Sequence, residues 1–116
     1  MTNPHFASAK SAAGLLFLSG QVAFDSAGRL TAETIEAQTT QCLVNIEEVL
    51  RQHGLGRRAV VKTTVWLRTT SDFVSFNNAY ATFFGDHKPA RSTVRADLMI
   101  AGALVEIEAV ATSTLL

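Results

Sequence analysis

Two charged residues in the C-terminal third of the chain have the types and the spacing to do chemistry. Arg91 follows Pro89 and Ala90 at the start of a predicted strand, and Glu106 comes fifteen residues later inside the apolar run ALVEIEAVA. The planar guanidinium group of an arginine can donate two parallel hydrogen bonds to a carboxylate. A glutamate can orient a water molecule and accept its proton. The pair could therefore handle a charged substrate, or it could be an ordinary cross-strand ion pair.

The strands that would position these residues follow from the sequence pattern. GLLFLSGQVAF reads as a strand with a bend or bulge at Gly20, and residues 59–69 as a β-branched strand. The last two strands are predicted at 91 to about 100 and at 104 to about 113. The short AGA between them indicates a hairpin. The expected order of elements is β-β-α-β-α-β-β.

Two amphipathic helices are predicted between the strands. From position 34 to about 53 apolar residues recur at steps of three and four, with Thr31 or Thr34 as the N-cap and Gly54 at the end. Ser71 is the predicted N-cap of the second helix. The apolar stripe of that helix consists of Phe73, Phe76, Tyr80, Phe83 and Phe84.

Two helices can cover only one face of the predicted sheet. The side of the hairpin expected under the helices consists of Val94, Ala96, Leu98, Val105, Ile107 and Ala109. The opposite side consists of Arg91, Thr93, Arg95, Asp97, Glu106 and Glu108, with Val60 and Trp66 beside them. We read Glu108 as structural and paired with Arg95. This mixed face suits packing against sister subunits around a wet interior better than plain exposure to solvent.

The composition restricts the class of protein. The chain has 116 residues, 47% of them hydrophobic and 17% charged, with a formal net charge of zero, so we expect one globular domain over residues 1–116 and no nucleic-acid partner. The longest uncharged run, residues 11–24, is too short to span a bilayer. The single cysteine, Cys42, fits a cytoplasmic protein and reads as a core residue. His5, His53 and His87 form no ligand cluster, so no metal is expected.

Over nearly its whole length the chain resembles the RidA (YjgF) family of small enamine/imine deaminases, whose members have also been labelled L-PSP-like endoribonucleases. The matching segments are LSGQV, VVKTTVWL, FNNAYATFF, PARSTV and VEIEAVA. The most specific feature is the fifteen-residue spacing from the arginine of PARS to the first glutamate of VEIEA. The resemblance implies a chorismate-mutase-like α+β fold, with a mixed sheet and two helices on one face. It also implies a homotrimer with a barrel core and three sites between subunits.

The resemblance further implies a reaction and a set of residues. The reaction is the hydrolysis of 2-imino acids and their enamines, such as 2-iminobutyrate and 2-aminoacrylate, to 2-keto acids and ammonia, without a cofactor. Arg91 matches the family's carboxylate-binding arginine, and Glu106 is the residue expected to activate water. The other implied positions bind or surround the substrate, with Thr93 acting mainly through its main chain: Ser19, Gly20, Asn77, Thr93 and Phe6.

The chain departs from the family pattern at three places. Phe6 stands where the deaminases usually carry the tyrosine of Gly-Pro-Tyr, so a hydroxyl group is missing. Thr93 stands where a cysteine is common, and the loop before Pro89 is a few residues shorter than usual. These departures keep two alternatives open. One is a divergent trimeric member that acts on another imine in a catabolic pathway, and the other is a non-catalytic ligand-binding or interaction protein.

Two of the implied site residues also have structural explanations from the sequence alone. Asn77 could be a helix residue that is tied to a loop. Ser19 could be a bulge residue without a chemical role. RNA cleavage is disfavoured, because the neutral chain shows no basic groove with interleaved aromatic residues.

Overall fold

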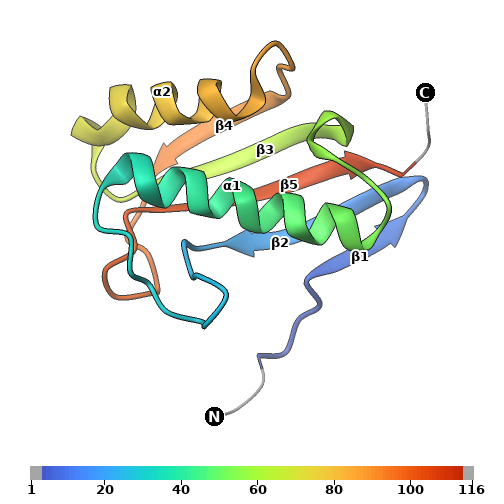
Figure 1. Cartoon of the computed structure of the whole chain (residues 1–116), viewed down its shortest axis with the longest axis horizontal. Helices are drawn as coiled ribbons and strands as arrows, with labels where there is room; N and C mark the ends of the chain where they lie inside the picture. The colour runs from blue at the N-terminus through green and yellow to red at the C-terminus, as the bar shows by residue number, and fades with distance from the viewer. Residues whose placement is uncertain (1–3, 114–116) are drawn as a thin grey trace.

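A computed structural model of the chain describes residues 4–113, and its elements follow the predicted order (Figure 1). These elements are β1 (Ala9–Ala12), β2 (Leu15–Gln21), α1 (Ile35–Gln52), β3 (Val60–Leu67), α2 (Phe73–Phe84), β4 (Ala90–Arg95) and β5 (Val105–Thr112). Short 3₁₀ turns at residues 57–59 and 70–72 precede β3 and α2. The architecture is the predicted mixed α+β type.

The five strands form one sheet in the order β1-β2-β5-β3-β4. Strand β5 runs antiparallel to both β2 and β3, whereas β4 lies at the edge and runs parallel to β3. The predicted hairpin of β4 with β5 is therefore wrong, because β3 lies between them. Strand β4 can pair in parallel with β3 because helix α2 connects the two strands and provides the crossover that such pairing needs. The AGA stretch belongs to a longer connection, and β4 ends at residue 95.

Both helices lie on one face of the sheet (Figure 1). Helix α1 begins as predicted, since the Thr34 side chain accepts a hydrogen bond of 3.1 Å from the Ala37 backbone N–H. The prediction of Ser71 as the cap of α2 is wrong. Residues 70–72 already form a 3₁₀ turn, and Asp72 takes the N-cap position without a side-chain hydrogen bond. Helix α2 ends at Gly85, whose φ of 63° favours glycine.

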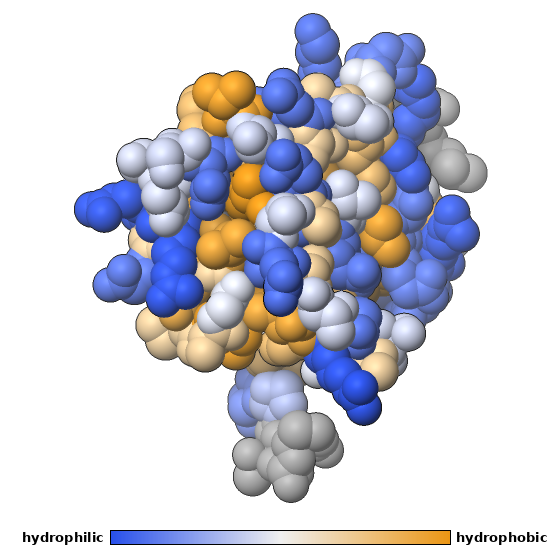
Figure 2. Space-filling model, turned by 60° about the vertical axis from the view of Figure 1, so that its left-hand side comes forward, coloured by the Kyte–Doolittle hydropathy of each residue, from blue (hydrophilic) through white to orange (hydrophobic). Residues whose placement is uncertain are grey.

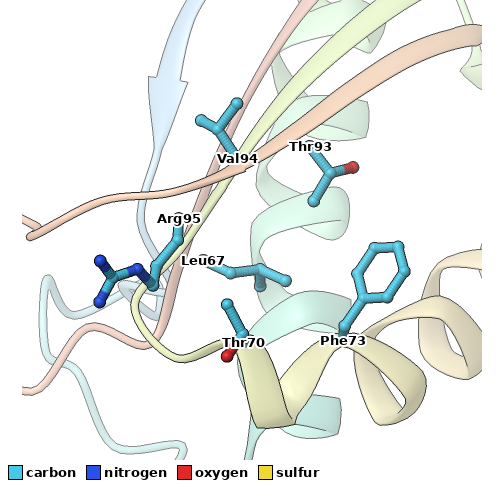
Figure 3. Close-up of a pocket in the computed structure, with 6 residues that line it drawn as sticks. All are labelled: Leu67, Thr70, Phe73, Thr93, Val94 and Arg95. Atoms are coloured by element: carbon cyan, nitrogen blue, oxygen red, sulfur yellow. The ribbon is translucent and has the colours of Figure 1, made fainter.

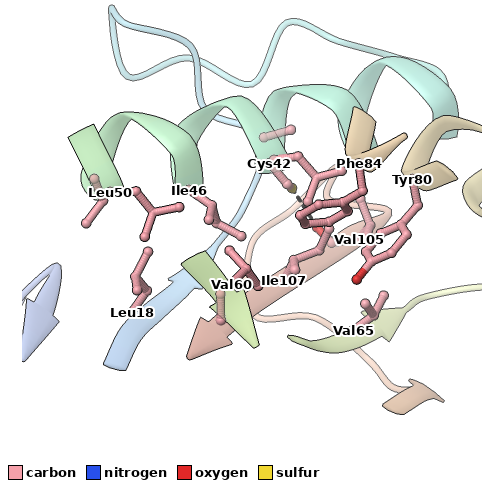
Figure 4. Close-up of a cluster of buried hydrophobic side chains, with 14 of the residues drawn as sticks. Leu18, Cys42, Ile46, Leu50, Val60, Val65, Tyr80, Phe84, Val105 and Ile107 are labelled. Carbon is pink, nitrogen blue, oxygen red and sulfur yellow. Dashed lines mark hydrogen bonds between the residues drawn. The ribbon is translucent and has the colours of Figure 1, made fainter. Parts of the chain in front are cut away.

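The hydrophobic core fills the space between the helices and the sheet (Figure 4). Val105, Ile107 and Ala109 of β5 point into it as predicted, and Ala111 continues this alternation. In β3 the register shifts between Val60 and Lys62, which is a β-bulge. As a result Val60 is fully buried in the core, which reverses the face predicted for it, and Val61 is exposed.

Strand β4 also has its faces reversed relative to the prediction. The register places Arg91 opposite Thr63 and Arg95 opposite Leu67, and both partners are buried under the helices. Val94 instead lies on the other face and is 48% exposed. The prediction assumed that the apolar side of this strand must point inward, whereas α2 covers its polar side. The predicted pairing of Arg95 with Glu108 is therefore wrong, because the two residues lie on opposite faces.

The face away from the helices, here called the open face, is mixed in character. Glu106 and Glu108 lie on it as predicted, half-buried, beside Trp66. Phe17 also points to this face and is 45% exposed. On the side of the molecule that Figure 2 brings forward, apolar surface is interrupted by hydrophilic residues. Between residues 4 and 113 no helix is both long and apolar enough to cross a membrane.

Candidate functional site

Arg91 lies on the helix side of the sheet, where it is held by α2. Its strand partner Thr63 is buried, and the Thr63 hydroxyl hydrogen-bonds the Tyr80 hydroxyl of α2 at 2.7 Å. The Arg91 Nη2 atom donates a hydrogen bond of 2.8 Å to Oδ1 of Asn77, which lies on α2 one turn before Tyr80. Asn77 therefore orients the guanidinium group.

Aromatic rings of α2 surround the guanidinium group. Its carbon lies 4.9 Å from the ring centre of Tyr80, 5.1 Å from that of Phe76 and 5.9 Å from that of Phe73. Contacts of this kind hold a cation without neutralising it. Among residues 4–113, no carboxylate lies within ion-pair distance of Arg91. Most of its donors are therefore left for a ligand. The sequence reading treated these rings only as an apolar stripe and missed their contact with Arg91.

Two cavities lie along what we call the α2–β4 groove (Phe73, Asn77, Tyr80, Arg91 and Thr93), and Arg91 lines one of them. The cavity shown in Figure 3 has a volume of about 180 Å³ and is lined by Phe73 and Thr93, among others. The other, of about 230 Å³, is lined by Arg91, Tyr80 and Lys88, among others. Thr93 faces the groove because it lies two residues after Arg91 on the same strand. The groove can thus hold a small carboxylate.

Gly20 and Glu106 meet on the open face, with Ser19 next to Gly20 on β2, and we call these three residues the open-face cluster. A Cβ atom added to Gly20 would lie 2.2 Å from Glu106 Oε2, so only glycine lets the carboxylate rest against β2 here. The register shift between Leu18 and Gln21 produces this close approach and confirms the bulge predicted at Gly20. Ser19 is tied down by two bonds, from its hydroxyl to the Ala7 carbonyl at 2.6 Å and from its N–H to the Ser8 carbonyl at 3.0 Å.

The environment of Glu106 favours a carboxyl group that can exchange a proton. Burial raises the pKa of Glu106 above its ordinary value, and the charge of Glu108, two residues away on the same face, raises it further. Glu108 also lines an open cavity with Phe6, Ser19 and Lys10. Phe6, 64% exposed, lies beside the open-face cluster and has no hydroxyl to offer there.

Arg91 and Glu106 lie on opposite faces of the sheet within one chain. Arg91 pairs with Thr63, on the helix side of β3, and Glu106 pairs with Trp66, on the open side. Strand β3 also separates their two strands. The expectation that they are cross-strand neighbours is wrong, and so is the alternative that they form a surface ion pair. One chain therefore presents two separate halves of the expected site.

The remaining candidates for chemistry have structural roles. Cys42 is fully buried, and burial, with a smaller contribution from the charge of Glu106, raises the pKa of its thiol to about 12. The ring nitrogens of His53 and His87 lie 3.0 Å and 2.8 Å from backbone carbonyls of Val49 and Val60. Residues 4–113 contain no cluster of histidine, cysteine and carboxylate side chains that could hold a metal ion.

Comparison with known proteins decides the family. The sequence profile described as "Endoribonuclease L-PSP" matches residues 2–113. The chain is 38% identical over 97 residues to the mouse 2-iminobutanoate/2-iminopropanoate deaminase, a match that covers 83% of this chain and 72% of the mouse protein. It is also 38% identical to Reactive Intermediate Deaminase A, chloroplastic, from Arabidopsis thaliana, over 92% of this chain and 58% of the plant protein. The chain belongs to the RidA (YjgF) family.

The fold of this RidA-family protein agrees with that assignment. The crystal structure of YyfA from Yersinia pestis, a member of the conserved Rid protein family, superimposes with a TM-score of 0.90 at 37% identity. The superposition covers 96% of this chain and 90% of the Yersinia chain. The RidA-family relatives therefore share the overall architecture of this chain.

Proposed function

We propose that this protein hydrolyses reactive 2-imino acids and their enamine forms, such as 2-iminobutyrate and 2-aminoacrylate, to 2-keto acids and ammonia. It acts as a single-domain subunit of a cytoplasmic homotrimer with a chorismate-mutase-like barrel core. The observation that carries the proposal is Arg91, a guanidinium group held by Asn77 and aromatic rings without a carboxylate partner in residues 4–113. Such a group suits a substrate whose carboxylate is adjacent to a C=N bond. Relatives with deaminase names support the reaction class.

The active site is formed between subunits. Arg91, Asn77 and Thr93 come from the α2–β4 groove of one copy, while Glu106, Ser19 and Gly20 come from the open-face cluster of the next. The separation of the two groups within one chain supports this arrangement, because neither half holds both an anion-binding group and a base. Exposed apolar side chains on the open face, among them Phe17 and Val94, support the burial of that face between copies.

The chemistry needs only positioning and proton transfer. Arg91 fixes the substrate carboxylate, and the Thr93 main chain holds the nitrogen end. Glu106 accepts a proton from a water molecule as its oxygen attacks the carbon of the C=N bond. The nitrogen gains both protons of that water molecule, one passed on by Glu106 and one from the added hydroxyl group. It departs as ammonia when the C–N bond breaks, and the carbon keeps the oxygen as a ketone. Proton-transfer assistance of this kind contributes about 10²–10⁴-fold.

A second candidate rests on position 6 and on the short loop before Pro89. Phe6 offers no hydroxyl group, and the loop borders the cavity that Arg91 lines. A different imine, hydrolysed by the same residues in a catabolic pathway, would fit these two features. The neutral charge of the chain gives no support to RNA as a substrate, despite the name of the family profile.

A coupled assay tests the proposal. A threonine dehydratase generates 2-iminobutyrate in place, and the appearance of 2-ketobutyrate is followed with the wild type, Arg91→Ala and Glu106→Ala. The wild type should exceed the spontaneous rate, and Arg91→Ala should return it to that rate while remaining folded and trimeric. Lack of acceleration by folded, trimeric wild-type protein would refute the proposed substrates, and a panel of imines made by an amino-acid oxidase would then test the second candidate.

A further inference from the structure

A second cationic side chain, Lys88, lines the same cavity as Arg91. This cavity, of about 230 Å³, lies at the C-terminal half of α2, and among residues 4–113 no carboxylate lines it. The loop that carries Lys88, residues 85–89, joins α2 to β4 (Figure 1). Two cations beside one small space repel each other unless an anion lies close to both. Because the chain as a whole is neutral, this excess of positive charge is local to the cavity.

The backbone of Lys88 is fixed by the residues on either side of it. His87 is anchored twice, because its Nε2 atom lies 2.8 Å from the Val60 carbonyl and its backbone N–H donates to the Phe84 carbonyl at 3.2 Å. Pro89 has a fixed φ and restricts the residue before it to extended conformations. The short loop therefore holds Lys88 at the edge of the cavity that Arg91 lines.

The charge of Lys88 is not neutralised within residues 4–113. No acidic side chain of that part of the chain lies within ion-pair distance of Lys88. Asp86, two residues earlier, pairs instead with Arg58 at 2.6 Å and does not line the cavity. The cavity is also larger than one carboxylate group needs, since a water molecule in the liquid takes about 30 Å³. Arg91 and Lys88 together thus leave room and charge for a ligand with two anionic groups.

We propose that Lys88 binds a second anionic group of the substrate, so that the preferred substrates are 2-imino acids whose side chain ends in a carboxylate. This inference rests on the proposed function, and it names the class of imine for the second candidate above. The carboxylate next to the C=N bond lies on Arg91, and the substrate side chain extends along the cavity to Lys88. Lys88 then determines specificity and takes no part in proton transfer. The imines formed by oxidation of glutamate and aspartate belong to this class.

Two other roles for Lys88 predict different results. If its methylene groups only covered apolar side chains of α2, a neutral side chain of similar length would replace it without loss. If an acidic residue of a neighbouring subunit paired with it, its replacement would weaken the trimer and lower the rates on all imines alike. Recognition of a second anion predicts a loss that is confined to the dicarboxylic imine, in a trimer of unchanged stability.

The test measures the ratio of two rates. An amino-acid oxidase, with catalase present, generates the imine of glutamate or of 2-aminobutyrate in place, and the appearance of each 2-keto acid is followed. The wild type should prefer the glutamate imine. Lys88→Met should lower kcat/KM on that imine by about tenfold, the size expected for one charge-assisted hydrogen bond, and change the other by less than about twofold. Lys88→Arg keeps the charge and should recover most of the loss.

Arg51→Met is the matched control for the loss of a positive charge. Arg51 is an exposed cation of α1, with 69% of its side chain accessible, and it does not line the cavity of Arg91. Its replacement should leave the ratio of the two rates unchanged, because solvent and salt screen a distant exposed charge. Trimer mass and thermal unfolding are measured for each variant. Binding of the stable 2-ketoglutarate and 2-ketobutyrate gives a readout without turnover, and Lys88→Met should weaken only the first.

Three results would overturn the inference while leaving the proposed function intact, provided that the wild type hydrolyses either imine. The first is a wild type without preference for the glutamate imine. The second is a Lys88→Met variant that keeps the wild-type ratio of rates. The third is an equal loss on both imines, or a loss explained by dissociation of the trimer, which would make Lys88 a structural residue. A wild type inactive on both imines would instead count against the proposed function itself.

Discussion

Two arginines contact α2, and their surroundings are opposite in kind. Arg57, just before β3, donates hydrogen bonds to both carboxylate oxygens of Glu47, at 2.6 and 2.9 Å, and another to the Phe83 carbonyl. Its guanidinium carbon also lies 3.9 Å from the ring centre of Phe83. Arg91, in the α2–β4 groove, has the rings and one amide oxygen but no carboxylate within residues 4–113.

The difference separates an arginine that is neutralised within the fold from one that is free to bind the anion that the proposed function requires. Arg57 joins α1 to the end of α2, and its charge is balanced inside the chain. The charge of Arg91 is balanced by nothing in the described chain, although the side chain is held in place. An arginine that is held in place but not neutralised is suited to bind an anion. The predictions below test this contrast.

Replacing each arginine by lysine should separate the two roles most strongly. Arg91→Lys keeps the charge but loses the planar fork, so kcat/KM on 2-iminobutyrate should fall about 100-fold, which corresponds to the loss of a charge-assisted contact. Its thermal unfolding should change little. Arg57→Lys is the matched control and should do the reverse, with a lower unfolding temperature and an unchanged kcat/KM. Equal effects of the two substitutions on activity would remove the contrast.

The activity should also be sensitive to a single methyl group added to the open-face cluster. Gly20→Ala places a Cβ atom where Glu106 Oε2 now lies, so the carboxylate must move. Activity should drop at least tenfold, since catalysis depends on a well-placed base. Gly56→Ala is the control, because the space around that residue is open and its φ of −129° suits alanine. Wild-type kinetics in Gly20→Ala would show that Glu106 is not held for catalysis.

The Arg57–Glu47 contact should be visible in stability and not in activity. Arg57 lowers the pKa of Glu47, chiefly by hydrogen bonding, so the ionised pair stabilises the fold above the ordinary pKa of 4.5. That stabilisation is lost as the pH falls through the lowered pKa of the folded state. Glu47→Gln should therefore cost about 1–2 kcal/mol of unfolding free energy at pH 7 and less in acid. Chemical denaturation at both pH values, with the exposed Glu48→Gln as control, measures the difference.

The smallest effect concerns the acid limb of the pH–rate profile. The pKa of Glu106 is raised by burial and by the charge of Glu108, which lies two residues away on the same face. If Glu106 accepts the proton, activity is lost as the pH falls through this raised pKa. Glu108→Gln removes the repulsion, so the limb should move to lower pH by less than about one unit. A limb that stays in place, or moves equally in Glu48→Gln, would exclude Glu106 as the base.

The sequence predicted the helices and strands better than the way the strands pair and which face each one buries. Steps of three and four defined α1, and strict alternation placed Glu106 and Glu108 of β5 on the open face. Alternation along β4 could not show that α2 would cover its polar side, because that depends on the parallel pairing with β3. The bulge at Val60–Lys62 is a tertiary feature without a glycine to mark it. The candidate residues of the site remain a prediction, and the sequence did not show that they divide between two faces of the sheet.

The central claim is that Arg91 of one subunit works with Glu106 of another, and complementation tests it directly. Arg91→Ala and Glu106→Ala, each inactive alone, are carried on two differently tagged chains and co-expressed in equal amounts. Random trimers should have both residues intact in about a quarter of their sites, so about a quarter of the wild-type rate should return. A mixture no more active than either variant alone, although native mass spectrometry shows mixed trimers, would contradict the account.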